Sequence, residues 1–321
     1  MGFDAETEIT EQSVRWRRGV HPIVLTLGRL FLGCSQIIEN RFFLQHPDAE
    51  TVQDDPGVQL PDKPVIWVAN HGFKDDILAS VLAAKRHLFF LLASLPQFYN
   101  TFDGVTAWLN GVILANRKVR ASKQTVVPKA VQALHMGSDI LIFPEGVWNK
   151  SPNALILNLW PGIYRIACET GAAVVPIIHN KKDYTIKDRS DPIHTVIDTP
   201  VRIDDLSEEA ALSLVRDILA TWHYLMMEAY GKSSRAELLS DSSTQAEAWS
   251  KHLEARVKTA DRYDREIELC ADYRQKNIIR PEDVWKAVAE IKVPGRNNVL
   301  DIAFARQIIE TANENDFQRR F

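Results

Sequence analysis

Between Pro61 and about Gly231 the chain alternates short apolar runs with segments whose apolar residues recur every three or four positions. The short runs have the length and composition of buried strands, and the periodic segments are typical of helices. A helix that follows each strand returns the chain to the same end of the sheet, so that neighbouring strands run parallel. The pattern predicts an α/β domain with a mostly parallel central sheet flanked by helices.

The expected elements alternate along this region. The predicted strands are Val65–Ala69, Leu88–Ala93, Val112–Leu114, Ile140–Phe143, Val174–Ile178 and Thr195–Ile197. The predicted helices are Asp76–Lys85, Ser122–His135, Ile163–Thr170 and Glu208–Tyr230.

Three regions differ in character, and we predict one domain with an appendage on each side. Residues 1–45 are expected to form an N-terminal apolar, amphipathic helical segment. Residues 46–231 are the expected α/β domain, which begins with a Pro- and Asp-rich linker over His46–Lys63. Residues 232–321 are charge-dense and predict a helical extension, with candidate helices at Gln245–Ile267, Pro281–Ile291 and Asn298–Asn313.

The apolar run His21–Gly33 is too short, and too interrupted by Arg29, to predict a transmembrane helix. A basic cluster at Arg15, Arg17 and Arg18 precedes it. Basic residues beside an apolar helix suit a position at a membrane surface among anionic headgroups. A helix packed on the domain core explains the run equally well, so both interpretations stay open.

The composition excludes several classes of protein. The formal net charge is -4, so the chain lacks the excess of basic residues that favours nucleic-acid binding. Its three cysteines are far apart and have no zinc spacing, which predicts neither a disulfide framework nor a metal site. No Walker-type loop or G-x-G-x-x-G occurs, and an acidic N-terminus without a signal sequence predicts a cytoplasmic protein.

Asn70-His71-Gly72-Phe73-Lys74-Asp75-Asp76 lies between the first predicted strand and the first predicted helix. Strand ends of this kind expose reacting groups in open α/β sheets. If His71 stays in the loop and Asp76 opens the helix, the carboxylate can orient the imidazole, whose other nitrogen then accepts a proton. The alternative is an ordinary helix start, with Asn70 as a cap and the acids favoured by the helix dipole.

Three later segments also place polar or turn residues at strand ends. Gly111–Arg117 is an apolar strand that finishes in an arginine, and Phe143-Pro144-Glu145-Gly146 ends a buried strand with a carboxylate and a glycine. Val175-Pro176-Ile177 belongs to a later apolar strand. Each segment alone is explained by a charged surface residue, a turn or a core strand.

The four segments together, in this order, resemble the motifs of the glycerolipid acyltransferase family, whose members include the 1-acylglycerol-3-phosphate (lysophosphatidic acid) acyltransferases. The resemblance covers about Pro64 to Pro200 and implies transfer of a fatty acyl group from an acyl thioester to an alcohol. The expected donor is acyl-CoA or acyl carrier protein, and the expected acceptor is the hydroxyl of a lysophosphatidate-like glycerolipid. No permanently bound cofactor and no metal are expected.

The resemblance implies a role for each matching residue. His71 is the expected general base, Asp76 orients it, and the acceptor attacks directly without an acyl-enzyme. The remaining expected site residues bind the acceptor, and they are Asn70, Arg117, Phe143, Glu145, Gly146 and Lys150. The backbone amides near Gly72 or Gly146 are the candidates for the oxyanion hole. A peripheral position on the inner face of the membrane and a role in phospholipid biosynthesis follow as expectations.

The chain departs from the family pattern where a phosphate is usually bound. Val147-Trp148-Asn149 stands in place of Thr-Arg-Ser, and Leu159-Trp160-Pro161-Gly162 in place of Phe-Lys-x-Gly. The tryptophans are core residues or flat surfaces for a sugar, a larger headgroup or an acyl chain. Two alternatives therefore remain: the same chemistry on another lysophospholipid, glycolipid or alcohol, and a non-catalytic lipid-binding protein. A metal hydrolase is less well supported, since no further His/Asp cluster completes a site.

Overall fold

The computed structural model describes residues 9–32, 37–41, 60–71, 75–93, 102–115, 120–146, 156, 159–181 and 193–229. Its elements are α1 (Glu11–Leu32), β1 (Ile37–Arg41), β2 (Ile66–Ala69), α2 (Asp76–Ala84), β3 (Leu88–Ala93), α3 (Phe102–Asn110), β4 (Val112–Ala115), α4 (Arg120–His135), β5 (Asp139–Ile142), α5 (Gly162–Thr170), β6 (Val174–Lys181), β7 (Ile193–Ile197) and α6 (Glu208–Ala229).

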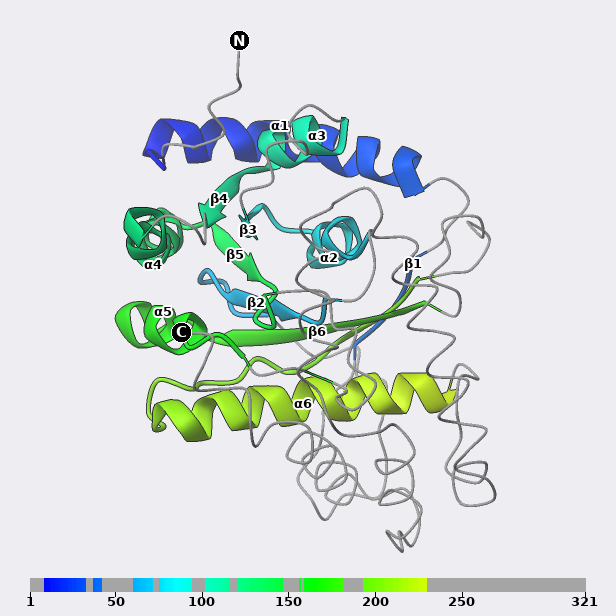
Figure 1. The fold of residues 1–321 in the computed structure, drawn as a ribbon. Helices are drawn as coiled ribbons and strands as arrows, with labels where there is room; N and C mark the ends of the chain where they lie inside the picture. The colour runs from blue at the N-terminus through cyan, green and yellow to red at the C-terminus, as the bar shows by residue number, and fades with distance from the viewer. Residues whose placement is uncertain are drawn as a thin grey trace, which may run out of the picture.

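A single sheet of seven described strands forms the centre of the molecule (Figure 1). The strand order is β1-β7-β6-β2-β5-β3-β4. Of the pairs in it, only β6 with β7 is antiparallel, and the others are parallel. The expected α/β fold with a mostly parallel sheet is therefore confirmed.

Helices cover both faces of the sheet because side chains alternate along each strand. On β2, Ile66 and Val68 belong to the core cluster that includes residues of α4, α5 and α6. Val65 and Trp67 belong to the cluster on the other face, with residues of α2 and α3. In Figure 1, α1 lies with α3 on one side of the sheet and α6 lies on the other, beneath β6.

Two elements of the fold were not predicted, β1 and α3. The Ile37–Arg41 strand has only two apolar residues, and it pairs with β7, so the sheet begins before the expected boundary at residue 45. Helix α3 is short, with nine residues of which one is charged. Of the expected linker only residues 60–63 are described, and the three candidate C-terminal helices lie outside the described residues.

Helix α1 extends the expected N-terminal helix backwards to Glu11, so the basic cluster lies on it. The helix contacts α2 and α3, and it buries Val14 and Val24. Trp16, Ile23 and Leu30 are exposed. Among the helices that the structure describes, none is long and apolar enough to cross a membrane.

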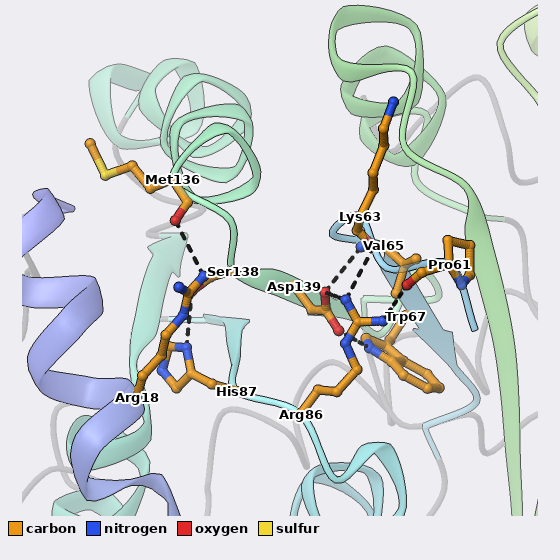
Figure 2. A network of polar contacts seen from close by, with 10 residues as sticks. All are labelled: Arg18, Pro61, Lys63, Val65, Trp67, Arg86, His87, Met136, Ser138 and Asp139. Carbon is orange, nitrogen blue, oxygen red and sulfur yellow. Dashed lines mark hydrogen bonds and ion pairs between the residues drawn. The ribbon is translucent and has the colours of Figure 1, made fainter. Parts of the chain in front are cut away.

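Asp139 organises a polar network at the amino ends of the strands (Figure 2). Its carboxylate accepts hydrogen bonds from Val65 N at 3.1 Å, Arg86 Nη2 at 3.0 Å and Trp67 Nε1 at 2.9 Å. Burial raises the pKa of this carboxyl group, and the hydrogen bond from Trp67 and the charge of Arg86 act against the shift. The network thus joins β2, β5 and the turn before β3.

His87 also lies where the strands begin, at what we call the amino edge of the sheet (Figure 2). Its Nε2–H donates to the carbonyl of Asn110 at 2.8 Å, and its Nδ1 accepts from the hydroxyl of Ser138 at 2.9 Å. Asn110 also contacts His21 of α1 through its side-chain oxygen at 3.2 Å. Burial lowers the pKa of His87 to about 4, so this ring is a neutral structural link.

Candidate functional site

The candidate site lies at the opposite side of the sheet, where the carboxyl ends of the parallel strands meet. We call this the carboxyl edge. Strand β2 lies between β5 and β6, and each of these three strands is parallel to its neighbour. Asn70 and His71 follow β2 directly, and the turn Phe143–Gly146 follows β5. Because parallel strands end at the same edge, segments far apart in the sequence meet here.

His71 and Asp76 form the pair that their spacing predicts. The Nδ1 atom of His71 lies 2.8 Å from Oδ2 of Asp76. Asp76 is the first residue of α2 and its side chain is fully buried, whereas the His71 side chain is 15% exposed. A carboxylate accepts only, so neutral His71 donates through Nδ1–H and carries its lone pair on Nε2. The pair therefore has the tautomer that a general base needs.

The alternative of a plain helix start is only partly correct. Asp76 does lie in the first turn, where the helix dipole stabilises a carboxylate. Asn70 is not the cap, since Asp75 occupies that position and makes no side-chain capping bond. Asn70 instead binds β6: its Nδ2 donates to the carbonyl of His179 at 3.0 Å, and its Oδ1 accepts from His179 N–H at 2.8 Å.

The turn after β5 supports the loop that carries His71. Oε1 of Glu145 accepts a hydrogen bond from the backbone N–H of His71 at 3.2 Å. The Phe143 ring lies against the imidazole, with 4.6 Å between ring centroids. Gly146 has a φ of +69°, a conformation that favours glycine, and its N–H donates to the carbonyl of Phe143 at 2.9 Å. Of the two oxyanion candidates, the Gly146 amide is thus already used by the turn.

The structure describes only some of the other residues that the sequence singled out. Arg117 and Lys150 lie outside the described residues, as do Gly72 and Trp148. Trp160 is described and packs against the core cluster beside α5, and its backbone N–H donates to the carbonyl of Pro144 at 2.8 Å. Trp160 is therefore partly buried against the core, as the first of its two interpretations expects.

Sequence reasoning missed three residues next to the pair. His179 in β6, Ser80 in α2 and Thr195 in β7 are buried, and their side chains are hydrogen-bonded to one another. The only sequence signal is a histidine that continues the apolar run Val174–Ile178. Within the described part of the chain, no group of three or more metal-ligating side chains could hold a metal ion.

Residues 48–180, which include both members of the pair, match the family model described as Acyltransferase. Over this segment, called the acyltransferase segment below, the chain is similar to that family. The acyltransferase segment accounts for the strands β2 to β6 and for the turns that surround His71.

The chain is also similar to curated proteins. It is 31% identical over 117 residues to a 1-acyl-sn-glycerol-3-phosphate acyltransferase of Chlamydomonas reinhardtii, covering 36% of this chain and 34% of the relative. A 1-acyl-sn-glycerol-3-phosphate acyltransferase of Borreliella burgdorferi is 25% identical, over 40% of this chain and 54% of the relative. The chain thus aligns with about a third to half of the length of these relatives.

The fold is shared with a solved structure. The crystal structure of the 1-acyl-sn-glycerophosphate (LPA) acyltransferase PlsC from Thermotoga maritima is similar, with a TM-score of 0.50 and 19% sequence identity. The match covers 69% of this chain and 84% of that chain. The shared fold therefore extends beyond residues 48–180.

Proposed function

We propose that this chain is an O-acyltransferase that moves a fatty acyl group from an acyl thioester to the hydroxyl of a lysophosphatidate-like glycerolipid. The observation that carries the proposal is the His71–Asp76 pair, with its 2.8 Å contact, in the acyltransferase segment. The carboxylate is buried and the imidazole is partly open to solvent. A pair that served only as a helix start would not need a partly exposed imidazole ring.

The proposed reaction needs one base and no covalent enzyme intermediate. His71 Nε2 accepts the proton of the acceptor hydroxyl while the oxygen forms a bond to the thioester carbonyl carbon. The buried Asp76 carboxylate stabilises the imidazolium that results. When the tetrahedral intermediate collapses, the carbon–sulfur bond breaks and the thiolate takes the proton from His71. An ester and a free thiol leave, and the enzyme returns to its starting state.

Lysophosphatidate is the proposed acceptor because the relatives are named as 1-acyl-sn-glycerol-3-phosphate acyltransferases. Phe143, Glu145, Gly146, Arg117 and Lys150 are the residues proposed to bind it, whereas Asn70, also expected there, is buried and binds His179 through both atoms of its amide. Val147 and Trp148 occupy positions where the family pattern has Thr-Arg. This replacement favours, as the second candidate, the same chemistry on an acceptor with a larger or uncharged headgroup.

Helix α1 is proposed to hold the protein on the inner face of a membrane. Its exposed residues Trp16, Ile23 and Leu30 are spaced seven apart and follow one side of the helix. Arg15 and Arg29 are exposed on the same helix. An apolar stripe beside cations suits an anionic lipid surface, where the acyl acceptor is found.

A matrix of donors and acceptors tests the function. The donors are acyl-CoA and the acyl thioester of acyl carrier protein, each with a labelled acyl group. Each donor is tested with lysophosphatidate, a choline lysophospholipid and monoacylglycerol. Monoacylglycerol differs from lysophosphatidate only by lacking its phosphate. We expect product lipid with an equal amount of thiol from lysophosphatidate. Turnover with another acceptor alone would move the assignment to the second candidate. Vesicle binding with no turnover of either donor would contradict the enzyme and support a lipid-binding protein.

A further inference from the structure

His179 is the buried residue that contacts both segments of the candidate catalytic pair. It lies in β6, next to β2, and its side chain has no exposed surface. In the family motif as matched here, β6 contributes only the apolar residues Val175-Pro176-Ile177. A histidine three residues beyond Pro176 has no role in the function proposed above.

The backbone of His179 fixes the segment that carries His71. Strand β2 pairs with β6 up to Ala69, which is opposite Ile177. Beyond that point the Asn70 side chain replaces the backbone as partner, donating to the carbonyl of His179 and accepting from its N–H. Two reciprocal bonds from one amide side chain extend the ladder by one step, and the next residue in the chain is His71.

The ring of His179 fixes the helical turn that carries Asp76. Its Nε2 lies 2.7 Å from Oγ of Ser80, and the Ser80 hydroxyl donates to the backbone carbonyl of Asp76 at 2.8 Å. Since that hydroxyl proton is used, Ser80 accepts the Nε2–H of His179. The other ring nitrogen, Nδ1, accepts from Oγ1 of Thr195 at 2.8 Å, directly across the antiparallel pair β6–β7.

We propose that His179 is a positioning residue for the acyl transfer proposed above: its backbone holds the loop of His71, its ring holds the first turn of α2, and together they set the distance between imidazole and carboxylate. The chain of contacts runs from Thr195 through His179 and Ser80 to Asp76, and from Asp76 to His71. The inference rests on the proposed function for its kinetic test but not for its spectroscopic one.

The electrostatics agree with this geometry. Burial lowers the pKa of His179 to about 4, and the nearby charge of Asp76 acts in the opposite direction. The ring is therefore neutral at physiological pH and works as one donor and one acceptor. A neutral link does not compete with His71 for the negative charge of Asp76.

Ser80→Ala is the main test, because alanine favours the helix and removes only the hydroxyl. His179→Leu removes the ring from the other end of the same contact. Ser138→Ala is the matched control, since it removes the hydroxyl that binds His87, the equally neutral but only partly buried histidine of the amino edge. All variants are made in the full chain, and circular dichroism and thermal unfolding confirm that each is folded.

We expect kcat to fall about 10- to 100-fold in Ser80→Ala and in His179→Leu, because misplaced catalytic groups lose rate even when binding is intact. The KM values for donor and acceptor should stay close to wild type. The double variant should be no slower than the slower single variant, since both break one contact. Ser138→Ala should keep the wild-type kcat.

The spectroscopic test does not need turnover. The proton shared by His71 Nδ1 and Asp76 should give a downfield proton NMR signal, identified by its loss in His71→Gln. We expect Ser80→Ala to weaken or shift this signal and Ser138→Ala to preserve it. A wild-type signal and kcat in Ser80→Ala would overturn the inference, and if His179→Leu fails to fold, Ser80→Ala decides alone. If the wild-type protein transfers no acyl group, the proposed function fails while the NMR comparison still decides on His179.

Discussion

The two edges of the sheet use similar residues for different ends. Each edge has a buried aspartate and a histidine whose pKa burial lowers to about 4; His179 is fully buried and His87 partly so. At the amino edge, Asp139 is paired with an arginine, a backbone amide and an indole, all of which have fixed positions and cannot move a proton at neutral pH. At the carboxyl edge, Asp76 is paired with a histidine that is partly exposed. The partner of the carboxylate, rather than its burial, separates a structural network from a candidate catalytic one.

The strongest test of this comparison replaces one histidine at each edge. His71→Ala should lower kcat by about 100- to 10,000-fold in a protein that still folds, because the proposed general base is lost. His87→Ala should leave the kcat of the folded protein unchanged. It should destabilise the protein by about 2–4 kcal/mol, because the buried Ser138 and the Asn110 carbonyl lose their hydrogen-bond partner.

Acyl transfer and urea unfolding measured on the same preparations separate the two effects. A His71→Ala protein that retains substantial activity would show that the exposed histidine is not the base. A His87→Ala protein that is fully stable but slow would reverse the assignment of the two edges.

The two aspartates form the next pair. Asp76→Asn keeps the shape of the side chain but removes the charge that stabilises the imidazolium, so kcat should fall about 10- to 1,000-fold. In the wild-type protein the Asp139 carboxylate accepts hydrogen bonds from three donors. In Asp139→Asn the new amide NH₂ group must face one of these donors, which leaves that hydrogen bond unmade. We expect that variant to lose about 2–4 kcal/mol of unfolding free energy and to keep its kcat.

Steady-state kinetics and denaturant unfolding of both aspartate variants provide the measurement. The comparison fails if Asp139→Asn lowers kcat in the folded protein as much as Asp76→Asn does.

Acid should weaken both edges together. The pKa values of His87 and His179 are lowered to about 4 in the folded protein, from the ordinary 6.5, in each case first by burial. Above pH 6.5 both histidines are neutral in the folded and in the unfolded protein, so the free energy of unfolding has its full value. As the pH falls from 6.5 to 4, the two histidines take up protons only in the unfolded chain. Each of them should therefore lower the free energy of unfolding by about 3 kcal/mol. Burial raises the pKa of Asp139, and its earlier protonation in the fold offsets part of the loss at the acid end.

Unfolding free energies measured in urea between pH 7.5 and pH 4 test this dependence. Below pH 6.5 the two histidines give the free energy of unfolding a slope against pH, and His87→Gln should remove about half of that slope. An unchanged slope in that variant would mean that His87 is protonated in the folded protein.

The smallest expected effects come from the aromatic neighbours of each edge. Trp67→Phe removes the hydrogen bond to Asp139 and should cost about 1–2 kcal/mol of stability with no change in kcat. Phe143→Leu removes the ring that lies against His71 and should lower kcat a few-fold. Thermal unfolding and initial rates, recorded in parallel, show whether each change stays at its own edge. A rate defect in Trp67→Phe would contradict the separation.

The sequence predicted those parts of the fold and site that depend on local pattern. The central strands are recognisable because they are buried on both faces and hence apolar throughout, as in Ile140–Phe143. His71 and Asp76 were paired correctly because only five positions separate them. Strand β1 was missed because it has only two apolar residues, and its pairing with β7 cannot be predicted from its own sequence.

Contacts across long sequence separations explain the rest. Asparagine is a common residue at helix caps. Only the β2–β6 pairing reveals that Asn70 binds His179, 109 positions away. Glu145 was expected to bind the acceptor, and its contact with the His71 amide depends on strands β2 and β5 lying side by side. The Asp139 network draws on three separate segments, and no motif joins them.

The pairing of β1 with β7 also has a consequence for how the chain assembles during synthesis. Helix α1 contacts α2 and α3, and Ile9 and Arg18 are hydrogen-bonded to Gln132 and Met136, so these partners have all been synthesised by Met136. Strand β1 follows α1 directly, but Ile37 must wait for Ile193 before it has a partner. A contact of such long range is late and slow to form, so an early-made strand edge stays open for most of translation. We therefore expect nascent chains stalled before residue 193 to be the species most prone to aggregate or to bind chaperones.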